Sequence, residues 1–158
     1  MPLERKPAMT LAIACGCVLL AAGSAGAPPR WTALIDVSGA CCYAVPPDWK
    51  IDAASESTNT MTSSPDGRAT SVVQWSSQAV WPALVATLRS IVPATAVHEQ
   101  SRRRFWIEYA SAWPGVHHLA VIPANGGGCM LYVDVSEKAD PRLHATATEI
   151  IRSLTALR

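Results

Sequence analysis

The sequence lacks an excess of charge of either sign. Only 16% of its 158 residues are charged, and its formal net charge is +1. Proteins that bind nucleic acid or an anionic membrane through electrostatics need a surplus of Lys and Arg, so this composition argues against both classes of partner. The chain holds a single Phe, whereas its six Trp residues are many for this length.

Motifs of familiar catalytic sites are also missing. The chain has no Gly-x-Ser-x-Gly elbow, no Cys-x-x-Cys and no His-x-x-x-His spacing. Gly126–Gly128 is not followed by Lys and Ser or Thr and does not open a helix, so it predicts a hairpin turn and not a phosphate loop. A Cys–His nucleophile would be silenced by oxidation to a disulfide. We therefore expect no catalytic residue and no cofactor.

The first 27 residues predict a secretory signal peptide. Arg5 and Lys6 supply positive charge, the run from Met9 to Ala22 is apolar, and Ala25–Ala27 has the small-x-small form of a cleavage site. The apolar run falls short of the roughly 20 residues that a membrane anchor needs. A lipoprotein signal is the alternative, but no Leu stands three residues before Cys15 or Cys17.

The remaining chain has the size of one domain. Removing residues 1–27 leaves about 130 residues, an ordinary domain length, and takes away two basic residues and one acidic residue, which brings the net charge to zero. No later apolar run is long enough to span a bilayer. We expect a loosely ordered lead-in over 28–40, one domain over 41–158, and export to the periplasm or the extracellular space.

Three cysteines follow the signal: Cys41, Cys42 and Cys129. In an oxidising compartment one pair of them is expected to form a disulfide. Adjacent residues fit disulfide geometry badly, which favours Cys129 bonded to Cys41 or to Cys42. Alternation along the strand places Cys41 with the more apolar face, but Cys42 lies nearer the centre of the strand. Of the two, we favour Cys42.

Sequence periodicity predicts two helices among several strands. A helix over 79–91 has Pro82 in its first turn, and a helix over 140–157 has Asp140 as N-cap and Pro141 at its first position. Pro65–Gly67 predicts the turn of a hairpin. The apolar stripe of the second helix is Leu143, Ala147, Ile150, Leu154 and Leu157. Strands are expected at 41–45, 58–63, 68–75, 94–100, 104–112, 116–123 and 129–136.

The order of these elements predicts an α+β fold. Short connections between strands favour antiparallel pairing, so we expect a single antiparallel sheet of about six strands with packed helices. No repeat and no second domain is evident.

Three segments resemble the PsbP-like family, whose α/β/α sandwich is shared by the extrinsic photosystem II protein and the Mog-type Ran-binding factor. They are the strand and Pro-Pro-Asp-Trp of 42–49, the strand 130–135, and the closing segment 150–154. The resemblance covers 41–157. It implies an exported bacterial member of unknown role, and a binding or assembly module instead of an enzyme.

His117 and His118 are the most suggestive pair for a metal site. Neighbouring residues of a strand point to opposite faces, so the two cannot easily bind one ion. A site would need His98, His144 or a carboxylate brought in by folding. From the sequence we expect no metal.

Arg102, Arg103 and Trp113 are the candidate contacts with a partner. The two arginines fall in a predicted turn before aromatic residues, and Trp113 falls in a Trp-Pro-Gly turn, where a large side chain is hard to bury. The sequence favours an exported, non-enzymatic binding or assembly module of the cell envelope, whose partner is an envelope protein or a small ligand. The alternative is a small periplasmic hydrolase or metal-dependent enzyme.

Overall fold

A computed structural model of the chain describes residues 30–52, 60–77 and 83–157. The expected signal at 1–27 and the expected start of the first helix at 79–82 lie outside these residues. In chain order the elements are β1 (Thr32–Ile35), β2 (Cys41–Val45), β3 (Lys50–Asp52), β4 (Thr60–Ser63), β5 (Ala69–Ser76), α1 (Ala83–Ile91), β6 (Ala94–Gln100), β7 (Phe105–Tyr109), β8 (Gly115–Ala124), β9 (Gly127–Ser136), α2 (Pro141–Arg152) and β10 (Thr155–Ala156).

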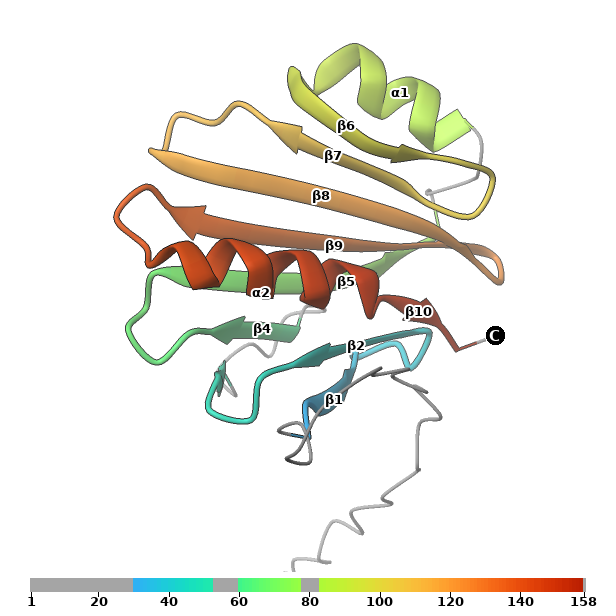
Figure 1. Cartoon of the computed structure of the whole chain (residues 1–158). Coiled ribbons are helices and arrows are strands. Elements are labelled where there is room, and N and C mark those ends of the chain that lie inside the picture. The colour runs from blue at the N-terminus through green and yellow to red at the C-terminus, as the bar shows by residue number, and fades with distance from the viewer. Residues whose placement is uncertain (1–29, 53–59, 78–82, 158) are drawn as a thin grey trace, which may run out of the picture.

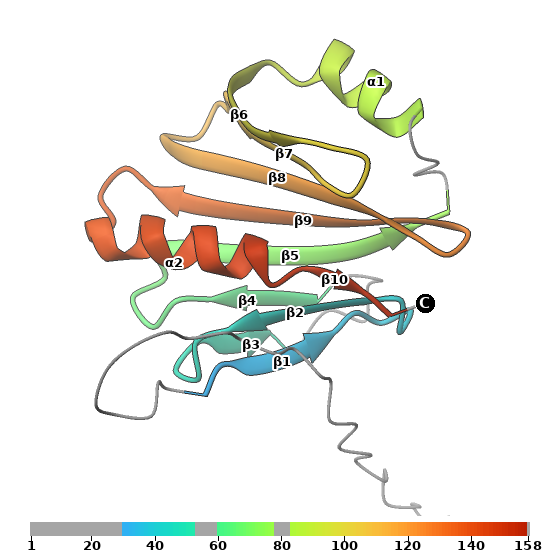
Figure 2. The same ribbon diagram turned by 45° about the vertical axis from the view of Figure 1, so that its right-hand side comes forward.

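The strands form two sheets where the sequence predicted one. The large sheet has seven strands in the order β3-β4-β5-β9-β8-β7-β6, and the small sheet has three in the order β1-β2-β10. Every strand pair is antiparallel. Figures 1 and 2 show α2 lying across one face of the large sheet, with β10 and β2 beside it and α1 near β6. The predicted α+β class and antiparallel pairing are confirmed.

Two apolar clusters hold the layers together. The larger one lies where α2 and the small sheet meet the large sheet, and it includes Tyr43, Leu131 and Ile150, all 0% exposed. The smaller one lies on the other face, where Leu88 of α1 contacts residues of β7, β8 and β9. Neither helix of the described chain is long and apolar enough to cross a membrane.

The lead-in expected over 28–40 is in part a strand. β1 pairs with β2 in a register that sets Ile35 opposite Cys42. The turn between these strands is fixed by the buried carboxylate of Asp36, whose Oδ1 accepts a hydrogen bond of 2.7 Å from the backbone N–H of Cys41. The Asp36 side chain accepts hydrogen bonds from the backbone of the turn and so orders this segment. The segment's own sequence pattern is too short to predict a strand.

The second helix ends at Arg152 and not at the expected residue 157. Ser153 ends the helix, and the chain then turns into β10, which pairs with β2. Leu154 is nevertheless 2% exposed, because the chain beyond the helix continues into the same core. The apolar spacing therefore continues beyond Arg152, where the helix ends, which is why the sequence predicted too long a helix.

The disulfide joins Cys41 to Cys129, with the two Cα atoms 5.7 Å apart. The preference for Cys42 was wrong. Cys41, Tyr43 and Val45 share the face of β2 that enters the main core, whereas Cys42 belongs to the other face. The two strands do not pair with each other, since β2 is in the small sheet and β9 in the large one. The bond therefore connects the two sheets.

Candidate functional site

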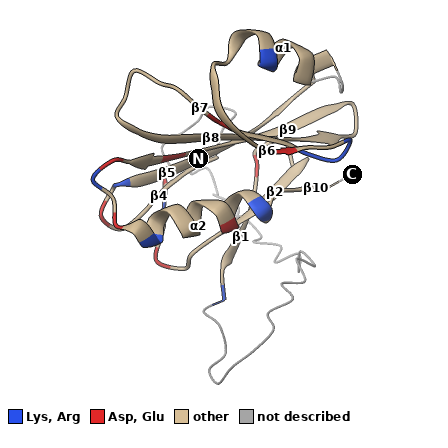
Figure 3. Ribbon diagram, turned by 45° about the horizontal axis from the view of Figure 1, so that its top comes forward, with Lys and Arg blue, Asp and Glu red and all other residues tan. Residues whose placement is uncertain are grey.

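The residues chosen from the sequence as partner contacts lie at opposite ends of one strand. Arg102 and Arg103 are exposed in the turn before β7, and Trp113 is in the loop after it. Figure 1 shows that turn and that loop at opposite ends of β7, and Figure 3 shows basic residues at the turn. The structure does not bring the arginines and Trp113 into one surface.

Arg104 has a structural role that the sequence did not suggest. Its Nη2 donates hydrogen bonds of 3.2 Å to the carbonyls of Arg152 and Leu154, at the C-terminal end of α2. A cation at this end satisfies orphan carbonyls and interacts favourably with the helix dipole. Of the three arginines at 102–104, Arg104 therefore holds the end of α2, and Arg102 and Arg103 are exposed.

Trp113 stands beside a cleft of about 510 Å³. Trp113 is 78% exposed, whereas most large apolar residues of the described chain are at least half buried. The cleft lies between the start of β5, the end of β9 and the loop from β7 to β8. It is lined by Gly67, Arg68, Ala69, Thr70, Tyr109, Ser111, Trp113, Pro114, His117, Asp134, Val135 and Ser136.

His117 holds the loop that carries Trp113. Its Nε2 lies 2.8 Å from the carbonyl oxygen of Trp113, and its Nδ1 lies 2.7 Å from Oδ1 of Asp134. Burial alone would lower the pKa of His117, but the hydrogen bond to the Trp113 carbonyl and the hydrogen bond and charge of Asp134 outweigh it and raise that pKa above its ordinary value. Because both nitrogens face acceptors, the doubly protonated ring satisfies both contacts.

Tyr109 lines the same cleft as a neutral hydrogen-bonding group. Its ring centroid is 5.6 Å from that of His117, directly across the strand pair. Burial, followed by the negative charge of Asp134 and the neighbouring Tyr132, raises the pKa of Tyr109 to about 12. Its phenol therefore stays protonated at physiological pH and can donate a hydrogen bond within the cleft.

The neighbouring His118 points to the opposite face of the sheet, as strand alternation predicted. It is 4% exposed and lies directly opposite Glu108 in register. Burial lowers the pKa of His118 to about 4, a change that the charge of Glu108 only partly offsets and that His98 and His144 reinforce. The pKa values of His117 and His118 are therefore shifted in opposite directions, although the two residues are adjacent in sequence.

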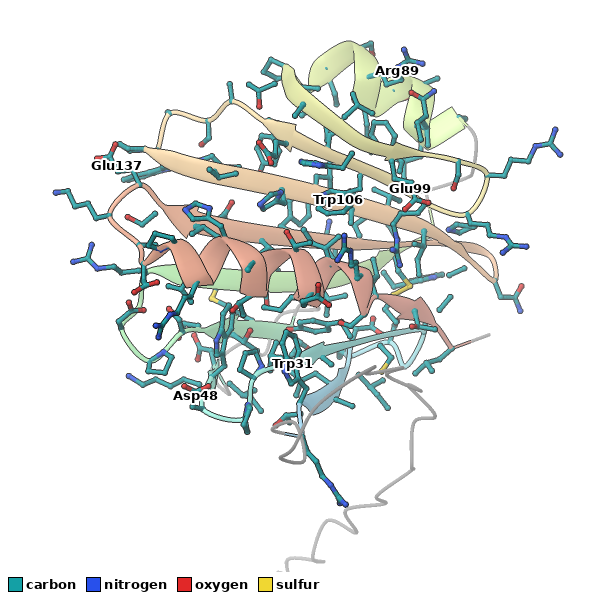
Figure 4. All side chains as sticks on the ribbon, in the orientation of Figure 1. Trp31, Asp48, Arg89, Glu99, Trp106 and Glu137 are labelled. Carbon is teal, nitrogen blue, oxygen red and sulfur yellow. A yellow bond between two sulfur atoms is a disulfide. The ribbon has the colours of Figure 1, made fainter. Side chains whose placement is uncertain are left out.

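Folding also brings His98 to His118, which the sequence left open. The Nε2 of His98 lies 2.7 Å from Oε1 of Glu108, and the same oxygen is 3.9 Å from Nδ1 of His118. The ring of His98 stacks on Trp106 with centroids 4.4 Å apart. Figure 4 shows Trp106 on the face of the sheet that carries α2. No spacing in the sequence reveals this cluster, because its members come from three strands.

Comparison with solved structures identifies the fold. No family model and no curated protein matches the sequence. The solution structure of cyanobacterial PsbP from Synechocystis is similar with a TM-score of 0.55 and 10% identity, over 87% of this chain and 98% of that one. The Saccharomyces cerevisiae Ran-binding protein Mog1p is similar with a TM-score of 0.51 and 14% identity, over 81% of this chain and 96% of that one. The chain therefore has the PsbP-like fold that its three segments predicted.

Proposed function

We propose that this protein is an exported binding or assembly module that engages a protein of the cell envelope through the cleft beside Trp113. The observation that carries the proposal is Trp113, a residue that is 78% exposed on a loop whose backbone is hydrogen-bonded to the sheet. The disulfide supports export, since such bonds persist mainly in oxidising compartments. The signal-like first 27 residues support it as well.

A Trp held in this way suits recognition. Exposed aromatic side chains are enriched among the residues that dominate binding energy at protein interfaces. The backbone carbonyl of Trp113 is hydrogen-bonded to His117, and the backbone N–H of Trp113 donates to Oγ of Ser111 at 3.3 Å. The backbone N–H of Ala110 donates to the carbonyl of Pro93. A loop that is already ordered loses little conformational freedom on binding, which leaves more of the contact energy for affinity.

The charges of the cleft favour a partner that offers a carboxylate next to an apolar side chain. Asp134 is already paired with His117, whereas no ion pair within the described residues involves the guanidinium of Arg68. Arg68 is exposed and lines the cleft with Trp113. A partner's apolar side chain would pack on the indole while its carboxylate meets Arg68, a pairing for which the guanidinium is well shaped.

The hydrogen bonds of His117 favour a binding role for this cleft over a catalytic one. A hydrolase of the Ser–His type needs a histidine nitrogen free to accept the proton of the nucleophile. Both ring nitrogens of His117 already face other acceptors, the Trp113 carbonyl and Asp134. We therefore propose that His117 orders the loop and does not act as a general base.

The experiment compares capture of envelope proteins by three versions of the purified protein. The wild type, Trp113→Ala and Val37→Ala are immobilised, and bound proteins are identified by mass spectrometry. Val37 is the matched control, because it is also exposed, at 66%, but lies in the turn between β1 and β2. We expect one component that the wild type and Val37→Ala retain and Trp113→Ala loses. Equal retention by Trp113→Ala would overturn the proposal.

A further inference from the structure

Three adjacent strands present potential metal ligands on the face of the sheet opposite the Trp113 cleft. His98 comes from β6, Glu108 from β7 and His118 from β8, and one ligand atom of each lies within 4.8 Å of the others. Glu108 is the shared neighbour: its Oε1 is 2.7 Å from Nε2 of His98 and 3.9 Å from Nδ1 of His118. Within the described residues, no other group of three or more His, Cys, Asp or Glu side chains lies close enough together to hold an ion.

A β-bulge places His98 in this group. The register between β6 and β7 shifts between Val97 and Glu99, so His98 is the extra residue of β6. Such bulges redirect a side chain, and here the imidazole is turned onto the face that carries Trp106. Its ring stacks on Trp106 at a centroid distance of 4.4 Å and an interplanar angle of 24°. The stacking orients Nε2 of His98 towards Glu108.

The cluster combines a fixed part with an adjustable part. His118 is 4% exposed and Trp106 7% exposed, and Nε1 of Trp106 donates a hydrogen bond of 3.5 Å to Nδ1 of His118, so both side chains are held in place. A metal ion bound to Nδ1 would replace that hydrogen bond. The side chains of His98 and Glu108 are 35% and 28% exposed, so they can adjust and an ion can reach them from solvent. His144 of α2 also acts on His118 through its charge, so a further imidazole is near.

Two imidazole nitrogens and one carboxylate oxygen form a ligand set suited to zinc and similar transition metals, and not to calcium or magnesium. Bond lengths of about 2.0–2.2 Å to the metal set neighbouring ligand atoms about 3.3 Å apart in a tetrahedral site. The distances of 2.7 Å and 3.9 Å lie on either side of that value. Rotamer shifts of about half an ångström in the two partly exposed side chains would equalise these distances.

We propose that His98, Glu108 and His118 form a binding site for one divalent transition-metal ion of the zinc class. Three protein ligands leave a fourth position for water or for a group from a partner. The site lies on the other face from Trp113, so it is independent of the proposed binding cleft. It accounts for the bulge and for the stacked orientation of His98.

The test titrates zinc chloride into the metal-free, folded protein, with affinity and stoichiometry measured by calorimetry. The wild type is compared with His98→Ala and Glu108→Gln, which change partly exposed side chains and are expected to fold. His117→Gln is the matched control, because it removes the other imidazole that contacts a carboxylate, Asp134. Circular dichroism verifies that all four proteins are folded.

We expect one zinc ion per wild-type chain. His98→Ala and Glu108→Gln should weaken binding by more than about 100-fold, since loss of a group that only orients a ligand already costs about 10–100-fold. His117→Gln should bind like the wild type. Absence of stoichiometric zinc binding in the wild type would overturn the proposal, as would equal binding by His98→Ala or loss of binding in His117→Gln.

Discussion

Reduction of the disulfide should destabilise the protein strongly, because the bond joins its two sheets. Cys41 belongs to β2 of the small sheet and Cys129 to β9 of the large sheet. Both residues are 0% exposed and belong to the main core. Cutting the bond frees a closed loop in the unfolded chain, so the effect arises mainly from the entropy of the unfolded state.

The size of the effect follows from the sequence separation of 88 residues. In the chain-entropy model a loop of that length contributes about 4.6 kcal/mol at 25 °C. Small domains unfold with a free energy of about 5–15 kcal/mol, so the reduced protein would lose roughly 30% or more of its stability. The stabilisation by the disulfide is large because the loop that it closes contains most of the residues of the domain.

Urea denaturation followed by tryptophan fluorescence measures this difference in the presence and absence of dithiothreitol. The free energy of unfolding of the wild type should fall by about 4–5 kcal/mol on reduction. Cys42→Ala should show the same drop, because Cys42 takes no part in the disulfide. Cys129→Ala should show no response to the reductant.

Two results would refute this reasoning. If oxidised and reduced wild type unfold at the same urea concentration, the bond does not join the sheets in the folded protein. If the response to dithiothreitol disappears in Cys42→Ala and persists when Cys41 is replaced by Ala, Cys129 pairs with Cys42.

Further predictions concern two histidines, the segment at the C-terminal end of α2 and one glycine. In metal-free protein, NMR titration should give His117 a pKa above 6.5 and His118 one of about 4. Because its pKa is raised, His117 stabilises the folded state below pH 6.5, and this stabilisation is lost as the pH rises through the pKa of His117 in the folded protein. Because the pKa of His118 is lowered, its effect is the opposite: the free energy of unfolding falls as the pH drops from about 6.5 to 4. Leu154→Ala should cost about 2–5 kcal/mol in chemical denaturation, and Arg152→Ala much less, because only Leu154 is buried. Gly127→Ala should cost about 1–3 kcal/mol in the same assay, because the added Cβ would lie 2.2 Å from the carbonyl oxygen of Ser76.

Local chemistry in the sequence predicted the parts of the fold that depend on neighbouring residues. Asp140 caps α2 by accepting a hydrogen bond from the N–H of Arg142, and Pro141 begins the helix. Gly126, with φ of 73°, makes the turn between β8 and β9. These features follow from backbone conformations that particular residues favour, and a single sequence contains that information.

The features that the sequence did not predict depend on contacts between distant segments. Leu154 continues the helical stripe because β10 enters the same core, so its spacing could not mark the end of α2. The choice of Cys41 over Cys42 depends on which face of β2 meets the large sheet. His98 reaches His118 only through a bulge in β6. Each of these depends on the position of another strand, which periodicity does not encode.

The proposed binding surface is tested most directly by site-specific photo-cross-linking in the cell envelope. A photoreactive phenylalanine analogue replaces Trp113, Arg102 or Val37, one position at a time, and adducts are compared after illumination. The account predicts a discrete adduct with an envelope protein from position 113, and none from position 102 at the other end of β7 or from position 37. An adduct from position 102 without one from 113, or the same adducts from all three positions, would contradict it.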